Sequence, residues 1–326
     1  MLKRIRVTPL AAESLGARSM CTFVETPDVK ILLDAAASLG PSRWGLPPHP
    51  REYRALAECR ERISKASEKA DVITISHFHF DHHTPSFTDW FCNWSSAEVA
   101  TQIYEDKIVL AKNHRSKVNP SQRRRGWMFS KTAGKHAERL AIADGGTFEF
   151  GDTRLKFSEP VFHGIRNTFL GWVLMTTIDY GEERVMFASD VEGPMHNPTV
   201  EMILGEAPDL LIIGGPPLYL AGFKVDEAHV QQGIRNLEEL VRNIPTTILE
   251  HHTLRDEKWR EACHPIFDAA SKAGHAVLTA AAFLKKENSL LECRRKELFE
   301  AEPPSADFKK WMNLPHLERR KVRPLI

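Results

Sequence analysis

The sequence predicts an α/β fold in which β-sheets are covered by helices on their outer faces. Three observations lead to this class: short β-branched runs open the chain, further β-type runs follow in the middle, and strands alternate with amphipathic helices toward the end. The apolar faces of such strands must be buried, and helices that pack on the sheets bury them. The 326-residue chain has 42% hydrophobic and 27% charged residues, a composition typical of a folded globular protein.

The first third of the chain is predicted to be mostly β, with one long helix. Apolar runs bounded by turn residues indicate the strands. Residues 51–70 follow a Pro-rich loop at 41–48 and have the spacing and charge of an amphipathic surface helix. The predicted strands are residues 4–8, 21–25, 29–34, 71–76 and 107–112.

After a polar, basic segment at residues 113–144 with weak helical signals, the chain becomes β-rich and then alternates between helix and strand. The strands expected there are residues 147–150, 154–158, 171–180, 184–188, 209–213, 246–250 and 275–280. The helices expected there are residues 199–205, 226–243 and 256–273, with a partly helical stretch at 289–301.

No internal repeat and no convincing linker divides the chain. We therefore expect a single domain over residues 1–302, with a basic insertion at about 112–140. A C-terminal tail over residues 303–326 is rich in Pro and Arg and is expected to fray.

Composition excludes several classes of protein. The five cysteines are scattered, odd in number and without a CxxC pair, which argues against a disulfide framework and a thiolate zinc site. The N-terminus lacks the apolar region of a signal peptide, and no apolar run approaches 18 residues. We therefore expect a cytoplasmic protein without a membrane partner. The net charge of +1 says nothing about other partners.

The segment that carries chemistry directly follows the predicted strand at 71–76 and reads HFHFDHH. His77, His79, Asp81 and His82 supply four imidazole and carboxylate groups within six residues, and divalent transition metals favour both kinds of ligand. In an extended turn His77 and His79 point to one side, because side chains alternate. Asp81 and His82 can then turn toward a second position, so the segment suits a pair of metals. The alternative interpretation is a polar loop with incidental histidines.

Three later strand ends complete the set. His163 follows one predicted strand, Asp190 ends another, and His251 and His252 follow a third. Each residue alone is more typical of a turn or a cap. Together they indicate one site, because each falls where a strand delivers its side chain to the edge of a sheet.

This order of motifs resembles the metallo-β-lactamase superfamily, over most of the chain from the ILLDAAA segment that holds Asp34 to the LEHH segment near residue 251. The resemblance implies an αβ/βα four-layer sandwich of two mixed β-sheets flanked by helices. Within the superfamily, the chain looks most like a poorly characterised, largely prokaryotic and archaeal branch. The aspartate near the N-terminus, Asp34, usually braces the site in this superfamily; a strand-end turn residue is the alternative.

The resemblance also implies a cofactor of two divalent metal ions, with zinc expected first and manganese or iron compatible. One ion would take His77, His79 and His163, and the second would take Asp81, His82 and His251, with Asp190 bridging both. His251 is preferred over His252 as the last ligand because of its place after the apolar strand, but His252 stays open.

The implied chemistry is hydrolysis. A metal-bridging hydroxide would attack a carbonyl or phosphorus centre, with Asp81 and Asp190 orienting it. A side chain from the region of His252 would protonate the leaving group. Members of the superfamily that use di-iron for redox work usually carry a carboxylate where this chain has His79, so hydrolysis is favoured over a redox or oxygen-handling protein.

The basic segment suggests the substrate. Residues 112–139 hold nine Lys or Arg against one carboxylate, interleaved with aromatic residues. Such a pattern suits a phosphate backbone or a stacked base, although a solvated charged face is the alternative. Arg123, Arg124 and Arg125 are the predicted substrate-binding residues, with Tyr219 from a Gly- and Pro-rich loop.

The expected substrate is therefore a phosphoester or a nucleic-acid derivative. The alternatives are a carbonyl substrate of the lactone or thioester type, and a nucleic-acid-binding protein with a vestigial metal site. A small-molecule or phosphoester partner is expected, and nucleic acid and a homo-oligomer stay open.

Overall fold

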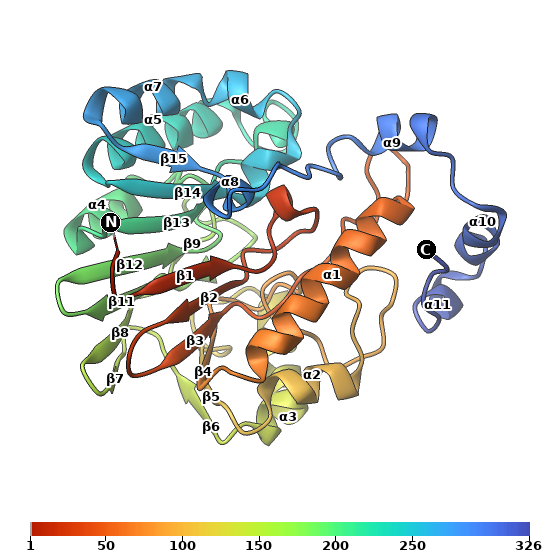
Figure 1. Cartoon of the computed structure of the whole chain (residues 1–326), viewed down its shortest axis with the longest axis horizontal. Helices are drawn as coiled ribbons and strands as arrows, with labels where there is room; N and C mark the ends of the chain where they lie inside the picture. Colours follow the sequence, from red (N-terminus) through yellow and green to blue (C-terminus); the bar gives the residue numbers. More distant parts are fainter. Residues whose placement is uncertain (1) are drawn as a thin grey trace.

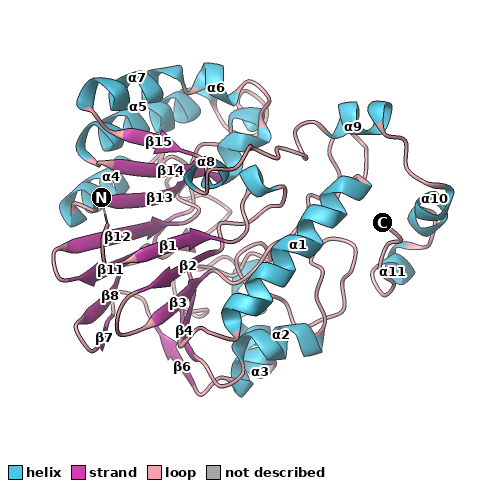
Figure 2. Cartoon of the chain, in the orientation of Figure 1, coloured by secondary structure: helices cyan, strands magenta, loops and turns pink. Residues whose placement is uncertain are grey.

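The computed structural model describes residues 2–326. Two large mixed β-sheets pack face to face, and helices cover the outer face of each (Figures 1 and 2). The predicted fold class, a four-layer sandwich of two mixed sheets flanked by helices, is confirmed. No helix in the described part of the chain combines the length and apolar character needed to cross a membrane.

The first sheet comes from the N-terminal half of the chain. Its strands follow chain order, antiparallel from β1 to β3 and parallel from β3 to β6. They are β1 (Arg6–Pro9), β2 (Thr22–Glu25), β3 (Lys30–Leu33), β4 (Val72–Ile75), β5 (Ile108–Ala111) and β6 (Arg139–Ile142). The helices α1 (Pro50–Ser67), α2 (Ala97–Tyr104) and α3 (Pro120–Lys131) belong to this half of the chain.

The second sheet is built from residues 147–278 in the order β15-β14-β13-β12-β11-β8-β7. Its strands are β7 (Thr147–Phe150), β8 (Thr153–Phe157), β11 (Thr176–Tyr180), β12 (Glu183–Ala188), β13 (Leu210–Gly214), β14 (Thr246–Glu250) and β15 (Ala276–Leu278). Strands β12 to β15 are parallel, so their carboxyl ends meet at one edge. The helices α4 (Asn197–Glu206), α5 (Glu227–Asn243) and α7 (His264–Ala273) cover this sheet.

Alternation along each strand explains the layers. Ile31 and Leu33 lie in the core between the sheets, whereas Leu32 lies in the core that the helices of the first half cover. In β13, Ile212 lies between the sheets and Leu211 lies under α5. Successive side chains of a strand point to opposite faces, so strands that are apolar on both faces can only be buried on both.

Two predicted elements are divided. The predicted strand at 171–180 becomes β10 (Trp172–Val173), which pairs with β9 (Val161–Phe162), and β11, which joins the large sheet. The predicted helix at 256–273 becomes α6 (Trp259–Ala262) and α7. Pro265 occupies the first turn of α7, where its missing N–H costs nothing, and this starts a new helix. The predicted strand at 275–280 ends at Leu278, and α8 (Ala280–Phe283) follows it.

The basic segment is more regular than its weak signals indicated. It forms α3, a short 3-10 helix η2 (Ala133–His136) and β6, and β6 extends the first sheet in register with β5. Asn119 caps α3 by accepting a hydrogen bond from the Gln122 N–H at 2.7 Å.

The expectation of a frayed C-terminal tail is wrong. After α9 (Arg295–Ala301) the chain forms α10 (Ala306–Met312) and α11 (His316–Arg319), which lie beyond α1 in Figure 1. Phe308 and Trp311 are buried in the same core as Tyr53 of α1. Two aromatic side chains therefore anchor the tail.

Candidate metal centre

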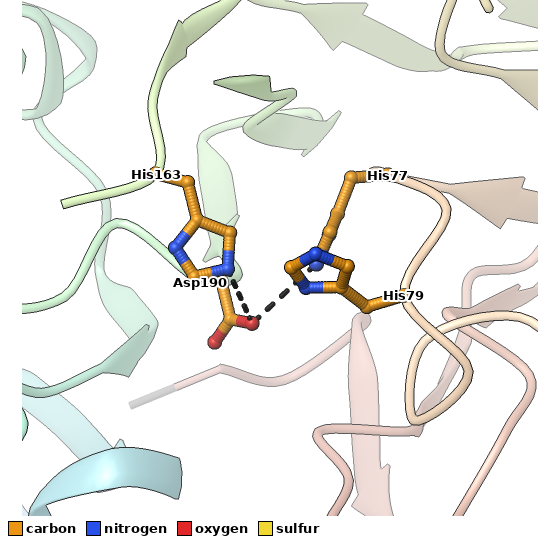
Figure 3. Close-up of side chains that lie close together, drawn as sticks. All are labelled: His77, His79, His163 and Asp190. Carbon is orange, nitrogen blue, oxygen red and sulfur yellow. Dashed lines mark ion pairs between the residues drawn. The ribbon is translucent and has the colours of Figure 1, made fainter. Parts of the chain in front are cut away.

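A first group of four side chains gathers from strand ends that are far apart in the sequence. His77, His79, His163 and Asp190 each offer one ligand atom, and these atoms all lie within 4.8 Å of one another (Figure 3). Asp190 Oδ2 lies 3.4 Å from His77 Nε2 and 3.1 Å from His163 Nε2. His77 follows β4 and Asp190 follows β12, as the sequence predicted, whereas His163 follows β9, a short strand that was not predicted.

A second group also meets Asp190. Asp81, His82 and His251 also place one ligand atom each within 4.8 Å of one another. His82 Nε2 lies 3.3 Å from His251 Nε2 and 3.1 Å from Asp190 Oδ2. His251 Nε2 lies 3.0 Å from Asp190 Oδ1. The carboxylate of Asp190 therefore faces both groups.

Several ligand atoms of these groups are buried without a hydrogen bond, as expected for atoms that bind divalent cations. His77 Nε2, His163 Nε2 and Asp190 Oδ1 are buried and make no hydrogen bond within residues 2–326. Buried polar atoms are nearly always hydrogen-bonded, so several unpaired ones that converge indicate a missing partner. Imidazole nitrogens and carboxylate oxygens are the donors that zinc, manganese and iron accept.

The other ring nitrogen of these histidines is held by a neighbouring group. Asp34 Oδ2 accepts a hydrogen bond from His82 Nδ1 at 2.8 Å. Ser76 Oγ lies 2.9 Å from His77 Nδ1, and Glu13 Oε2 lies 3.1 Å from His251 Nδ1. Such contacts orient a ligating imidazole and leave Nε2 for the metal. Asp34 also accepts from the Ser76 N–H at 2.7 Å, which matches a bracing position.

Charge in the cluster is concentrated on Asp190. Burial raises its pKa, but the surrounding imidazoles, His251 first, outweigh burial and hold the pKa well below its ordinary value. Burial lowers the pKa of His77 to about 4 and keeps that of His79 well below its ordinary range. At His163 burial acts in the same direction, but Asp190 outweighs it and raises the pKa to about 10. The buried carboxylate thus attracts positive charge into the pocket.

The two histidines after β14 both approach Asp190, but they have different further neighbours. His251 has a left-handed backbone with φ of 67°, which turns the chain sharply from β14 into the 3-10 helix η4 (His251–Arg255). His252 Nε2 lies 3.7 Å from Asp190 Oδ1 and 3.7 Å from Glu192 Oε1. Only His251 joins the group of Asp81 and His82.

Searches for related proteins give a consistent group of archaeal relatives, although no family model matches the chain. A UPF0282 protein of Methanopyrus kandleri is 42% identical over 294 residues, which cover 90% of this chain and 99% of the relative. The chain belongs to the UPF0282 family. A second member, from Thermococcus gammatolerans, is 44% identical over 299 residues, 91% of this chain and 96% of the relative. A third, from Korarchaeum cryptofilum, is 38% identical over 308 residues, 94% and 99% of the two chains.

Solved structures with a similar backbone share little sequence with this UPF0282 protein. The metallo-beta-lactamase fold protein YhfI from Bacillus subtilis is 14% identical, with a TM-score of 0.49 over 85% of this chain and 97% of that one. Tm1679, described as a metal-dependent hydrolase of the beta-lactamase superfamily, is 12% identical, with a TM-score of 0.45 over 85% and 96%. CmlA, a diiron beta-hydroxylase from Streptomyces venezuelae, is 13% identical with a TM-score of 0.46, and the match covers 86% of this chain but 53% of CmlA.

The predicted substrate-binding arginines of this UPF0282 protein lie on α3, beside the loop after β4. The Arg125 guanidinium lies 4.2 Å from the centre of the Phe80 ring and donates to the Phe78 carbonyl at 3.3 Å. Arg124 and Arg125 line a cavity of about 350 Å³. Arg123 is exposed and is not among the residues that line this cavity; its guanidinium donates to the Arg115 carbonyl at 3.3 Å.

Tyr219 lies beside His252. The two rings are stacked, with centroids 6.5 Å apart and planes 13° from parallel. The Tyr219 hydroxyl lies 3.4 Å from His252 Nδ1.

Three charged residues lie near the cluster that the sequence did not predict to be part of the site. Glu192 Oε1 lies 3.4 Å from His163 Nδ1, and its place two residues after Asp190 was the available signal. Glu13 and Arg255 form a buried ion pair, and Arg255 Nη2 lies 3.8 Å from Asp81 Oδ2. Glu13 comes from the 3-10 helix η1 (Glu13–Leu15), and no motif surrounds it.

Proposed function

We propose that this protein is a metal-dependent hydrolase that holds two divalent cations and acts on phosphoesters. The observation that carries the proposal is that the Asp190 carboxylate approaches members of both ligand groups. The first cation would be held by His77, His79 and His163, and the second by Asp81, His82 and His251. When bound, such a pair supplies Lewis acidity and an activated water. Zinc is the first choice, with manganese and iron as alternatives.

We propose that His252 stabilises the leaving group by a hydrogen bond. Arg255 Nη1 lies 3.1 Å from His252 Nδ1, and a guanidinium can only donate. Nδ1 therefore accepts, and neutral His252 carries its proton on Nε2. This atom faces Asp190, and its N–H can donate a hydrogen bond to the leaving-group oxygen and stabilise the negative charge that develops there.

The phosphoester preference rests on α3. Arg124 and Arg125 stand next to the loop that carries the ligands, and guanidinium groups match the geometry of phosphate oxygens. A neutral lactone or thioester gives these cations no charged partner.

Elemental analysis of the purified protein tests the metal centre. We expect two divalent ions per chain, and we expect Asp190→Ala to lose them because both groups face this carboxylate. Asp152→Ala, at an exposed aspartate, serves as the control and should keep both ions. Equal metal content in all three proteins would contradict the proposal.

A panel of phosphodiester, lactone and thioester substrates tests the reaction. We expect phosphodiester hydrolysis, with a lower rate when Arg123→Ala, Arg124→Ala and Arg125→Ala are combined. If the triple variant equals the wild type on every phosphoester, the arginines lose their assigned role. A clear preference for the lactone or thioester would replace the phosphoester by a carbonyl substrate.

A further inference from the structure

The loop after β4 carries predicted metal ligands, and its other side chains line a cavity. Phe80 and His83 are neighbours in sequence of the predicted ligands His79, Asp81 and His82. Both line the cavity of about 350 Å³ between residues 80–87 and α3. This volume is in the range of pockets that bind small molecules, roughly 300–1,000 Å³. A ligand in this cavity would lie directly against the loop that carries Asp81.

The walls of the cavity are aromatic and apolar. The rings of Phe80 and Phe87 meet edge to face, with centroids 5.2 Å apart. Met128 and Phe129 of α3 also line the cavity. Met128 is 45% exposed and Phe87 is 36% exposed, so apolar side chains stay open to solvent at its rim.

Polar groups mark particular places in this apolar lining. The His83 side chain is 2% exposed, and its Nδ1 donates to the His79 carbonyl at 3.0 Å. In the neutral ring this leaves Nε2 as an acceptor, and no hydrogen bond joins Nε2 to another residue in the described part of the chain. Arg124 and Arg125 add two cations.

We propose that this cavity binds the nucleobase of a nucleotide unit, whose phosphate Arg124 and Arg125 hold beside the metal loop. The inference rests on the proposed phosphoester hydrolysis and names its substrate class. Because the planes of the two rings are 79° apart, a planar base can stack on Phe87 and meet Phe80 at its edge, and stacking is favourable for every base. An acyl chain would fill the same walls but would leave His83 Nε2 without a donor, which an exocyclic amino group supplies.

Arg125 connects the cavity with the metal centre. It lines the cavity, and its guanidinium lies 4.2 Å from the centre of the ring of Phe80, the residue that precedes Asp81. A phosphate on Arg125 would therefore lie close to a predicted metal ligand. This places the reacting group and the base on neighbouring parts of one loop.

Calorimetric titration of the metal-loaded protein with adenosine monophosphate and with ribose phosphate tests the proposal. Because stacking of one base is worth about 1–3 kcal/mol, we expect adenosine monophosphate to bind at least about fivefold more tightly than ribose phosphate. Phe87→Ala should remove most of this difference, because it deletes one stacking ring.

A charge placed in the cavity gives a sharper comparison. Met128→Glu puts a carboxylate into the lining, whereas Trp127→Glu makes the same change one residue earlier, at a side chain that is 50% exposed and outside the lining. We expect Met128→Glu to weaken adenosine monophosphate by about tenfold or more through repulsion. Trp127→Glu should bind like the wild type.

Two outcomes would overturn the nucleobase pocket. The first is equal affinity for the two phosphates, with every variant alike. The second is tighter binding of octanoate than of adenosine monophosphate, lost in Met128→Glu, which would make the cavity an acyl pocket. An eight-nucleotide oligoadenylate identifies the source of the nucleotide unit: tighter binding of the oligomer supports the end of a nucleic acid, and equal binding supports a free nucleotide.

Hydrolysis of bis(p-nitrophenyl) phosphate, which has no nucleobase, separates this inference from the proposed function. If the metal-loaded protein hydrolyses it but does not distinguish the two phosphate ligands, only the nucleobase pocket fails. If it hydrolyses no phosphodiester but still binds adenosine monophosphate in a Met128-dependent way, the hydrolase proposal fails and the cavity remains a nucleotide site.

Discussion

At the scale of single residues, the surroundings of His251 determine which of its nitrogens is available. Glu13 Oε2 lies 3.1 Å from Nδ1, and Glu13 is itself fixed by an ion pair with the buried Arg255. Nε2 is left to face Asp190 and Asp81, at 3.0 and 3.6 Å. A group that touches no metal thus orients a predicted ligand.

Glu13→Gln should weaken metal binding without removing any ligand. Loss of the carboxylate frees the His251 ring to rotate, and changes of this kind typically cost about 10- to 100-fold in metal affinity. Competition with a chromophoric chelator measures the effect. Glu25→Gln, at a partly exposed carboxylate that pairs with Arg6, is the control. Unchanged affinity in Glu13→Gln would show that the ring is held by packing alone.

Glu250 predicts a dependence of stability on pH. Burial raises the pKa of its carboxyl to about 7, despite hydrogen bonds from Ser14 and from the Ala280 N–H. The folded protein therefore binds this proton more tightly than the unfolded chain does. The contribution to stability is complete below the unfolded pKa near 4.5 and is lost as the pH rises to about 7.

Glu250→Gln should remove this dependence. Urea unfolding of both metal-loaded proteins at pH 5 and pH 8 measures it, and the loss of stability between these values should be smaller in the variant by roughly 1–3 kcal/mol. Effects of pH on the metal centre are common to both proteins and cancel in the comparison. The same pH dependence in both proteins would exclude Glu250 as its source.

At the scale of elements, the approach of α3 to the loop after β4 depends on Gly126. A Cβ at this position would lie 2.4 Å from the His114 Cβ and 2.6 Å from a ring carbon of Phe78. Phe78 sits between His77 and His79, so the lack of a side chain at Gly126 allows α3 to pack close to the predicted ligands.

Gly126→Ala should therefore destabilise the protein although alanine favours helices. The added methyl must push α3 away, and overpacking of this kind costs about 1–3 kcal/mol. Gly205→Ala in α4 is the matched control, since a Cβ there has no neighbour within 4 Å. That change should stabilise by up to about 1 kcal/mol. Thermal unfolding measures the stability of both variants. A higher unfolding temperature in Gly126→Ala than in the wild type would contradict the close packing.

The sequence predicts a helix or strand well where a local hydrophobic pattern determines it. It predicts less well where the pairing of distant strands determines it. The strand ends that carry His77, Asp190 and His251 follow from β-branched runs alone. The division of residues 171–180 does not, because its two parts pair with different strands. Similarly, the run Arg123, Arg124 and Arg125 suggests three equal candidates, and only the turn of α3 shows which of them line the cavity.

At the scale of the whole molecule, the predicted ligands are divided between the two halves of the sandwich. The loop after β4 in the first sheet supplies His77, His79, Asp81 and His82. Asp190 and His251 follow strands of the second sheet, and His163 follows the small strand β9. Glu13, from the first half, could not be predicted because its partner His251 is 238 residues away.

Metal removal should loosen the contact between the sheets. A cation that binds only the folded state stabilises it by mass action, about 4 kcal/mol at a free concentration 1,000 times its Kd. Chelation should therefore lower the urea midpoint of the wild type. The same treatment of Asp190→Ala should have no effect, and an equal shift in both proteins would point to a different action of the chelator.

The aromatic anchor in the tail has a consequence for synthesis of the protein. The core around Tyr53 draws nearly all its members from residues 10–133, yet it is completed by Phe308 and Trp311. A ribosome delivers these two side chains long after the other members of this core. The N-terminal half therefore keeps an uncovered apolar surface on α1 until residues 308–311 have been translated, and in that interval this surface is open to chaperones and to aggregation.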